Sequence, residues 1–116
     1  DISLVPTPLC YYATNKLNIP NSIMITGSHN PQEYNGFKFI INNEPFYGEQ
    51  IKNLNNIKIK DNPEKIGVLK HVNIVSTYLS EIPNKLNIKK DLKIAWDIGN
   101  GVVGSMFQSI LKKNTR

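Results

Sequence analysis

The chain of 116 residues carries 14 Lys and Arg against 9 Asp and Glu, a net charge of +5, and 40% of its residues are hydrophobic. This length and apolar content are typical of a globular domain, and no apolar run approaches the roughly 18 residues that a membrane span needs. All but one of the positive charges are Lys spread along the chain, without the clustered Arg and aromatic residues of nucleic-acid binding proteins. We therefore expect neither a membrane nor a nucleic acid as a partner.

The cysteine content and the first residues indicate the cytoplasm. Cys10 is the only cysteine, so no internal disulfide can form, which fits a reducing compartment. Residues 1–3 contain neither the basic region nor the apolar region of a secretory leader. We expect no signal peptide and a cytoplasmic location.

In the first third of the chain, periodicity predicts a helix and two strands. Residues 8–17 place apolar side chains on one helical face, and a proline at position 8 suits a first helical turn. Residues 22–26, Ser-Ile-Met-Ile-Thr, are typical of a buried strand, and residues 36–41 predict a second strand. Between them, residues 27–35 form a polar loop.

The middle of the chain predicts a turn and two helices. The composition of residues 42–45, Asn-Asn-Glu-Pro, favours a turn. Residues 48–57 have apolar residues at helical spacing, and residues 58–69 are rich in polar residues and predict a surface connection. An apolar stripe over residues 71–83 predicts a longer helix that ends at Pro83.

The last part of the chain predicts the start of a second domain. We place a domain boundary in the polar segment 84–91, followed by a strand over residues 92–97, a tight turn at 99–101 and a helix over 102–113. Alternation of helix and strand predicts an α/β fold with a three-layer arrangement, in which helices cover both faces of a mixed or largely parallel sheet. Because the last unit is too small to close a core, we expect that the sequence stops early in a second domain.

The polar loop after the first strand carries the candidate chemistry. Gly27 permits a sharp turn, and Asn30 is restricted by the proline that follows it. Ser28 and His29 would then project from a short, anchored loop whose backbone N–H groups can bind an anion. Phosphoryl transfer needs positioning, positive charge and a group that moves the hydroxyl proton. Ser28 fits the phosphoryl carrier, while His29 and Lys38, on the next strand, fit the other two roles.

From the residues alone, other interpretations remain open. The loop also fits a solvated turn whose polar side chains satisfy its own backbone. A nucleophile elbow is excluded because Asn30 stands where glycine is needed, and the residues after Gly36 exclude a phosphate-binding P-loop. Residues 99–104, Gly-Asn-Gly-Val-Val-Gly, match a dinucleotide-binding fingerprint, although the acidic residue expected about 20 positions later falls beyond the sequence. We favour tight packing of a helix on a strand as the reason for these glycines.

Residues 26–31, Thr-Gly-Ser-His-Asn-Pro, resemble the phosphoserine signature of the α-D-phosphohexomutases. Residues 5–8, Val-Pro-Thr-Pro, look like the family's segment before this signature, and residues 34–38, Tyr-Asn-Gly-Phe-Lys, look like the segment after it. Residues 94–101 look like the opening strand and turn of the family's second domain. The likeness is strongest to the bacterial bifunctional phosphomannomutase/phosphoglucomutase group.

This resemblance implies an enzyme that interconverts hexose 1-phosphate and hexose 6-phosphate, of mannose or glucose, through a hexose 1,6-bisphosphate intermediate, with Mg²⁺. It implies that Ser28 is the phosphoserine, whose phosphate also ligates the metal. His29 and Lys38 would be active-site groups, Lys38 a candidate proton carrier, and Asn30 would shape the loop.

The sequence also departs from the family. Members have four domains and a much longer chain, and their metal-binding Asp-Gly-Asp-x-Asp loop does not occur here. The resemblance implies that residues 1–87 are the C-terminal part of domain 1, the phosphoserine domain, and residues 88–116 the start of domain 2. The partners expected are a phosphosugar substrate and the remaining domains. The alternative is a truncated, catalytically inert α/β fragment, and for the isolated residues we expect no activity and an exposed apolar face on the helix 102–113.

Overall fold

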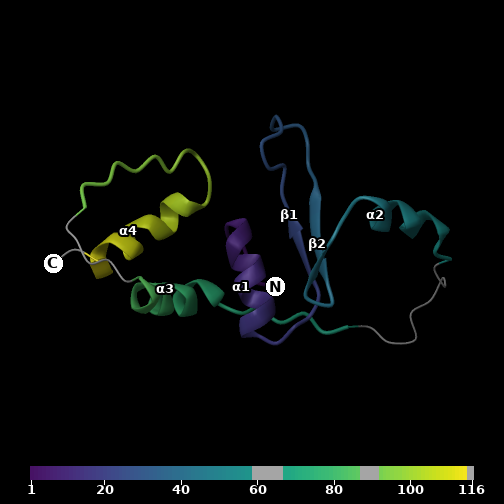
Figure 1. Cartoon of the computed structure of the whole chain (residues 1–116), viewed down its shortest axis with the longest axis horizontal. Helices are drawn as coiled ribbons and strands as arrows, with labels where there is room; N and C mark the ends of the chain where they lie inside the picture. Colours follow the sequence, from purple (N-terminus) through teal and green to yellow (C-terminus); the bar gives the residue numbers. More distant parts are fainter. Residues whose placement is uncertain (59–66, 87–91, 115–116) are drawn as a thin grey trace. The chain divides into compact units, whose positions relative to one another are not determined.

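The structure, a computed structural model, describes residues 1–58, 67–86 and 92–114. The chain forms two compact units, one made of residues 1–12 and 71–116 and the other of residues 13–70. Figure 1 shows the helices and strands along the chain. None of the helices in these ranges is long and apolar enough to cross a membrane.

Helix α1 (Thr7–Lys16) confirms the first predicted helix to within one residue at each end. It ends because Asn18 takes a left-handed conformation, with φ 52°. The Ile19 N–H then donates to the Thr14 carbonyl at 3.0 Å, and the Asn18 N–H donates to the Asn15 carbonyl at 3.3 Å. This pair of bonds is the Schellman motif, in which Asn is the usual substitute for Gly.

The first unit is built around helices α3 (Ile74–Lys85) and α4 (Val103–Asn114), which contact each other. Helix α3 begins later than predicted because Asn73 caps it, its side-chain oxygen accepting the Ser76 N–H at 3.3 Å. The helix also runs past Pro83 to Lys85, so Pro83 does not end it as predicted.

Apolar side chains from four segments form the core of this unit. Ile74 is 1% exposed, Met106 of α4 is also buried, and the Phe107 and Trp96 rings pack with their centroids 5.0 Å apart. The expectation of an exposed apolar face on helix 102–113 is therefore wrong at Met106 and Phe107. The remaining buried apolar residues of the unit come from the N-terminal segment and α1: Val5, Leu9 and Cys10.

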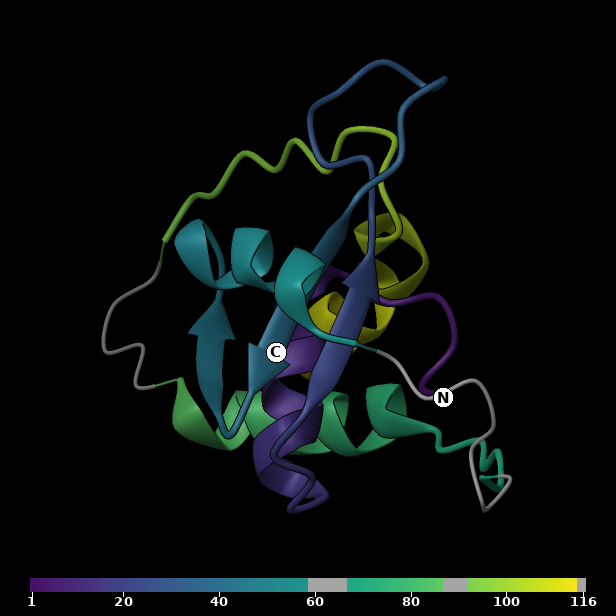
Figure 2. The same ribbon diagram turned by 90° about the vertical axis from the view of Figure 1, so that its right-hand side faces the viewer.

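The second unit contains a sheet of three antiparallel strands in the order β1 (Ser22–Ile25), β2 (Phe37–Ile41) and β3 (Glu44–Phe46), seen side by side in Figure 2. The α/β content is confirmed, but the predicted parallel sheet, with helices on both faces, is not what the described residues form. A parallel pair needs a crossover of about a dozen or more residues, usually a helix. Strands β1 and β2 are joined only by the polar loop, and β2 and β3 by residues 42–43.

Strand β3 was missed because residues 42–45 were predicted as one turn. Asn42 and Asn43 have φ values of 54° and 65° and form the whole turn, after which the chain pairs with β2 at once. Two successive left-handed residues are the type I′ hairpin turn, which suits the twist of the flanking strands. The Asn43 N–H donates to the Pro20 carbonyl at 2.8 Å, which ties the turn to the segment before β1.

The two faces of the sheet differ in chemistry. Residues paired directly across a ladder share a face, so the register divides the side chains into a lysine face (Ser22, Met24, Lys38 and Ile40) and an aromatic face (Ile23, Ile25, Phe37, Phe39, Ile41 and Phe46). On the aromatic face the ring centroids of Phe39 lie 6.2 Å from Phe37 and 6.4 Å from Phe46. Strand β1 is not the fully buried strand that was predicted, because Ile23 and Ile25 on this face are each 61% exposed.

Two further predicted elements differ from the structure. The helix predicted over residues 48–57 is the short α2 (Glu49–Asn53) followed by a single 3₁₀ turn, η1 (Leu54–Asn56), and neither buries a side chain. The strand predicted over residues 92–97 is wrong, since residues 92–98 form neither helix nor strand and are exposed. A strand needs a neighbour to take up its backbone hydrogen bonds, and none of the described strands pairs with this segment.

The remaining predicted elements are confirmed or lie outside the described residues. Residues 99–100 form the predicted turn, and α4 occupies the predicted helix 102–113 with its limits shifted by one residue. Residues 67–70 have no regular structure, as expected of a connection. Residues 59–66 of that connection and residues 87–91 of the predicted domain boundary lie outside the described residues.

Candidate active site

The loop between β1 and β2 leaves and re-enters the sheet at one point. The Thr26 N–H donates to the Gly36 carbonyl at 2.9 Å, which adds one more pair to the β1–β2 ladder. A Cβ on Gly27 would lie 3.0 Å from the Tyr34 carbonyl oxygen, and a Cβ on Gly36 would lie 3.0 Å from the Thr26 carbonyl oxygen. Both glycines are therefore needed for the close backbone approach that closes the neck of the loop.

Ser28 occupies a tight turn at the start of this loop. The Asn30 N–H donates to the Gly27 carbonyl at 3.0 Å, so Ser28 and His29 are the two central residues of the turn. Ser28 has φ 54°, whereas the φ of His29 is not positive. This is the pattern of a type II′ turn, whose first central position is normally Gly. For a residue with a side chain, the left-handed conformation costs about 1–2 kcal/mol.

The structure brings Ser28 and His29 together. The Ser28 Oγ lies 3.3 Å from the His29 Nδ1, and both residues are exposed. That separation is longer than the roughly 2.8 Å of a strong hydroxyl hydrogen bond. The two groups nevertheless face each other, so a small rotation of either side chain makes a direct proton exchange possible.

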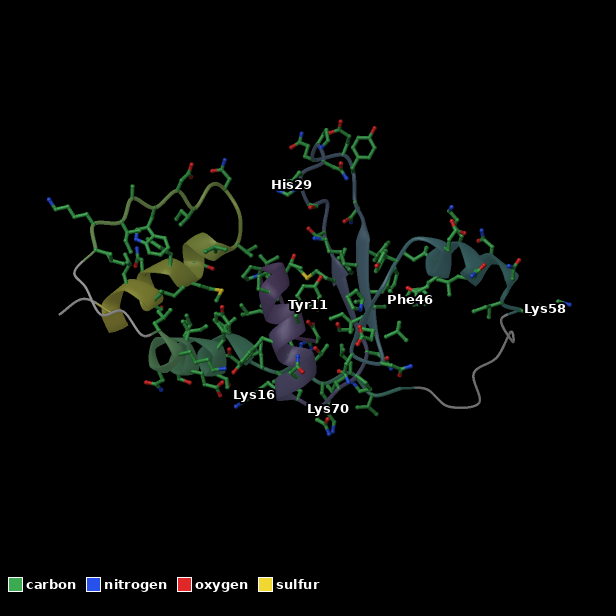
Figure 3. The ribbon with its side chains drawn as sticks, in the orientation of Figure 1. Tyr11, Lys16, His29, Phe46, Lys58 and Lys70 are labelled. Atoms are coloured by element: carbon green, nitrogen blue, oxygen red, sulfur yellow. The ribbon has the colours of Figure 1, made fainter. Side chains whose placement is uncertain are left out.

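Lys38 lies on β2, opposite Met24 of β1 and two residues from the loop neck at Gly36, or about 7 Å along the strand. Its side chain is exposed on the lysine face. Figure 3 shows His29 on the side of the hairpin opposite to Phe46, which belongs to the aromatic face. His29 and Lys38 thus lie on the same side, although no hydrogen bond or ion pair joins Lys38 to Ser28 or His29 within the described residues.

Asn30 contributes its backbone to the turn, as described above, and its side chain is exposed. Further on, the Tyr34 N–H donates to the Pro31 carbonyl at 3.0 Å, and the Gly36 N–H donates to the Asn35 Oδ1 at 3.0 Å. Several backbone N–H groups of the loop therefore find their hydrogen-bond acceptors within the loop itself. This arrangement suits a presented Ser28 hydroxyl and equally suits the solvated turn that the sequence left open.

One residue of the site was missed from the sequence. The Thr26 Oγ1 accepts the Ser28 N–H at 3.0 Å, so the last residue before the loop holds the backbone of Ser28. A Thr or Ser that bonds the backbone two residues on is a recognised turn former. Thr at position 26 followed by Gly-Ser is therefore a usable signal, although the sequence alone assigned Thr26 no role beyond the end of a strand and the first position of the signature.

The described residues contain no group of three or more His, Cys, Asp or Glu side chains placed to hold a metal ion. Mg²⁺ prefers six oxygen ligands and is usually held by one or two carboxylates together with phosphate and water. Ser28 offers one such ligand, and only after phosphorylation. Residues 1–58, 67–86 and 92–114 therefore bring together no carboxylate cluster of the kind that holds Mg²⁺.

The glycine-rich turn near α4 lacks the context of a dinucleotide site. The Gly99 N–H donates to the Asp97 Oδ1 at 2.9 Å. Gly99 has φ 53°, and this positive φ explains why glycine is present at position 99. A Cβ on Gly104 would lie 3.6 Å from the Ile98 Cδ1, an ordinary contact, so packing does not require this glycine. The fingerprint needs a preceding strand, and residues 92–98 do not form one.

Comparisons with known proteins agree on one family. Residues 1–65 match the family model described as phosphoglucomutase/phosphomannomutase, alpha/beta/alpha domain I.

A phosphomannomutase/phosphoglucomutase of Pseudomonas aeruginosa is 37% identical over 113 residues, which are 97% of this chain and 24% of the relative. A phosphoglucomutase of Neisseria meningitidis serogroup B is 36% identical over 115 residues, 97% of this chain and 25% of the relative. A probable phosphoglucosamine mutase of Methanobrevibacter smithii is 31% identical over 119 residues, 97% of this chain and 27% of the relative. The chain spans about a quarter of the length of these curated relatives.

Proposed function

The chain belongs to the phosphoglucomutase/phosphomannomutase family, and we propose that it is the part of a phosphohexomutase that carries the phosphoryl group on Ser28. The enzyme would be an isomerase that interconverts the 1-phosphate and 6-phosphate of mannose or glucose through a hexose 1,6-bisphosphate. The observation that carries the proposal is the exposed Ser28, held at the first central position of a tight turn with its hydroxyl facing His29.

The chemistry assigned to this chain is phosphoryl transfer to and from Ser28. In the forward step the bond from phosphorus to the Ser28 Oγ breaks and a bond from phosphorus to a sugar hydroxyl oxygen forms. The sugar hydroxyl gives up its proton, and the Ser28 oxygen gains one. The resulting bisphosphate returns its other phosphoryl group to Ser28 and leaves as the isomeric monophosphate. Each step thus needs one group that accepts a proton and one that donates it.

We assign these proton transfers to His29 and Lys38, and the shape of the turn to Asn30. His29 is within 3.3 Å of the Ser28 oxygen, so it is the partner for the proton on that oxygen. Lys38 lies on the same side of the hairpin, and its flexible stem lets the ammonium group approach the incoming sugar hydroxyl. A positive charge there also stabilises the charge on the transferring phosphoryl group.

Mg²⁺ and the other parts of the enzyme complete the proposal. Bound through the phosphate of Ser28, Mg²⁺ would neutralise charge on the transferring group. Its remaining ligands are expected outside these 116 residues, because the Asp-rich loop does not occur in the sequence. We further propose that residues 1–87 belong to the phosphoserine domain and residues 88–116 to the next, and that the enzyme works in the cytoplasm. The alternative, an inert fragment, is favoured by the exposed aromatic face and the incomplete metal site.

The proposal is tested by identifying the residue of the protein that carries the phosphoryl group. The full-length protein that contains this sequence is incubated with hexose 1,6-bisphosphate, digested, and mapped by mass spectrometry. We expect stoichiometric phosphate on the peptide that contains Ser28, and its loss when a hexose monophosphate is added. Phosphate on a different residue, or none on a protein with mutase turnover, would contradict the role of Ser28. A correctly folded full-length protein without any turnover would instead favour the inert alternative.

A further inference from the structure

We propose that Thr26 is a positioning residue for phosphoryl transfer: its hydroxyl holds Ser28 in the left-handed backbone conformation that presents the Ser28 hydroxyl. The inference rests on the proposed function of Ser28. It assigns a role to a residue that touches neither the sugar nor the phosphoryl group in the mechanism above.

The first support is that Thr26 is itself fixed. Its backbone N–H donates to the Gly36 carbonyl at 2.9 Å, and its side chain is half-buried, whereas Ser28 is exposed. Its Oγ1 then accepts the Ser28 N–H at 3.0 Å. Thr26 is therefore anchored to the strand β2 side of the neck, and its hydroxyl fixes the backbone of Ser28, two residues further along the chain.

The second support is that Ser28 has reason to leave this conformation. A φ of 54° places it where Gly is normally found, and no other side chain is seen to bond its N–H among the described residues. If the Thr26 hydroxyl were removed, the Ser28 N–H would turn to water and the backbone would be free to relax to negative φ. That relaxation swings the Ser28 side chain about the backbone and away from His29.

The third support is that the loop has little other freedom at this point. The two backbone segments of the neck are joined by the bond from the Thr26 N–H to the Gly36 carbonyl at 2.9 Å, an approach that the missing Cβ atoms of Gly27 and Gly36 permit. The Asn30 N–H bond to Gly27 holds the far side of the turn. The peptide unit of Ser28 is the part left to rotate, and the Thr26 hydroxyl is the contact that stops it.

The test uses variants of the full-length enzyme. Thr26→Val keeps the shape of the side chain and removes the hydroxyl, while Thr26→Ser keeps the hydroxyl. Thr77→Val, in helix α3 of the other unit, makes the same exchange and serves as the matched control. We expect Thr26→Val to lower kcat roughly tenfold, the factor typical of one lost hydrogen bond, with KM for the hexose phosphate unchanged. Thr26→Ser should restore most of the kcat, and Thr77→Val should resemble the wild type.

The outcomes separate this inference from the proposed function. Wild-type kcat in Thr26→Val, with Ser28→Ala inactive, would overturn the role of Thr26 and leave that of Ser28 intact. Equal losses in Thr26→Val and Thr26→Ser would overturn the role of the hydroxyl. Activity in Ser28→Ala would overturn the proposed function itself. Amide hydrogen exchange on the wild-type enzyme decides the point without any variant, because we expect the Ser28 N–H to exchange more slowly than that of His29, and equal rates would contradict the bond.

Discussion

The Ser28 Oγ lies 3.3 Å from the His29 Nδ1, and both residues are exposed at the start of the β1–β2 loop. In this arrangement a candidate nucleophile and a candidate proton carrier are adjacent in sequence and in contact. The pairing depends on the tight turn, because consecutive residues on a strand point to opposite faces. The turn thus places two side chains on one side of the hairpin where a strand would separate them.

Ser28→Ala should abolish most turnover of the full-length enzyme and leave its thermal unfolding midpoint close to the wild-type value. The side chain is exposed, so its loss removes the phosphoryl acceptor and very little packing. The matched control is Ser80→Ala, which removes an exposed hydroxyl that donates to the Thr77 carbonyl in α3. Steady-state assays with saturating bisphosphate check this. Near wild-type turnover in Ser28→Ala would remove Ser28 from the mechanism.

His29→Ala should lower kcat by roughly a hundredfold, the usual scale for a lost proton-transfer group. The control is His71→Ala, because His71 is exposed and its Nδ1 lies 3.2 Å from the Asp1 Oδ2, both in the other unit of the chain. The measurement is kcat in the full-length enzyme together with the rate at which Ser28 takes up phosphate. If both histidine variants retained wild-type rates, the contact between Ser28 and His29 would be part of the turn and nothing more.

Lys38→Ala should also lower kcat by roughly a hundredfold or more, because it removes both a proton carrier and a positive charge. Lys52→Ala is the control, since Lys52 is an exposed lysine of α2 that pairs with Glu49 one helical turn earlier. A change confined to KM would identify Lys38 as a binding contact instead. Equal, small effects of the two substitutions would exclude Lys38 from the site.

Gly36→Ala should destabilise the loop neck. The new Cβ would lie 3.0 Å from the Thr26 carbonyl oxygen, so the backbone of Thr26, whose N–H bonds the Gly36 carbonyl, would have to shift. Overpacking of this kind typically costs about 1–3 kcal/mol. Gly67→Ala is the control, because its Cβ would meet nothing within 4 Å. The thermal unfolding midpoint of the full-length protein should fall for Gly36→Ala only, and an unchanged midpoint would show that the neck adjusts freely.

The isolated chain of 116 residues should bind the dye anilinonaphthalene sulfonate through the aromatic face of its sheet. Ile23 and Phe37 on that face are 61% and 59% exposed, and Ile25 adds to the same surface. The double substitution Ile23→Thr and Phe37→Thr should remove most of the fluorescence increase. Leu4→Thr, at a residue that is 82% exposed in the other unit, is the control. Equal fluorescence in all three proteins would show that this face is covered in solution.

The sequence predicted the elements whose signals are local. Helix α1 was placed to within a residue, because its start is marked by Pro8 and its end lies next to Asn18, which takes the left-handed conformation. The strand expected over residues 92–97 failed because pairing depends on a distant partner that composition does not reveal. Strand β3 was missed for a different reason: the composition of residues 42–45 predicts one turn, whereas the positive φ values of Asn42 and Asn43 complete the turn in two residues.

At the candidate site, the motif proposes Ser28, His29 and Lys38 as site residues but does not predict how they are placed. The contact between Ser28 and His29 depends on a positive φ, which a serine rarely adopts and its sequence neighbours do not dictate. The bond from the Ser28 N–H to Thr26 depends on the same conformation. Residue types were enough to propose roles for these side chains, whereas the bond from Ser28 to Thr26 was recognised in the structure.

The edge position of β1 in the sheet affects how easily the β1–β2 loop opens. Within the described sheet β1 has a neighbour on one side only, so the segment that carries Ser28 is secured by a single ladder to β2. Edge segments of this kind open locally at a lower free energy than the global unfolding of the protein. The fraction of time in which Ser28 is correctly presented is therefore governed by the fraying of one pair of strands. A contact that covers the outer edge of β1 would therefore stabilise the conformation of the candidate nucleophile Ser28 without touching it.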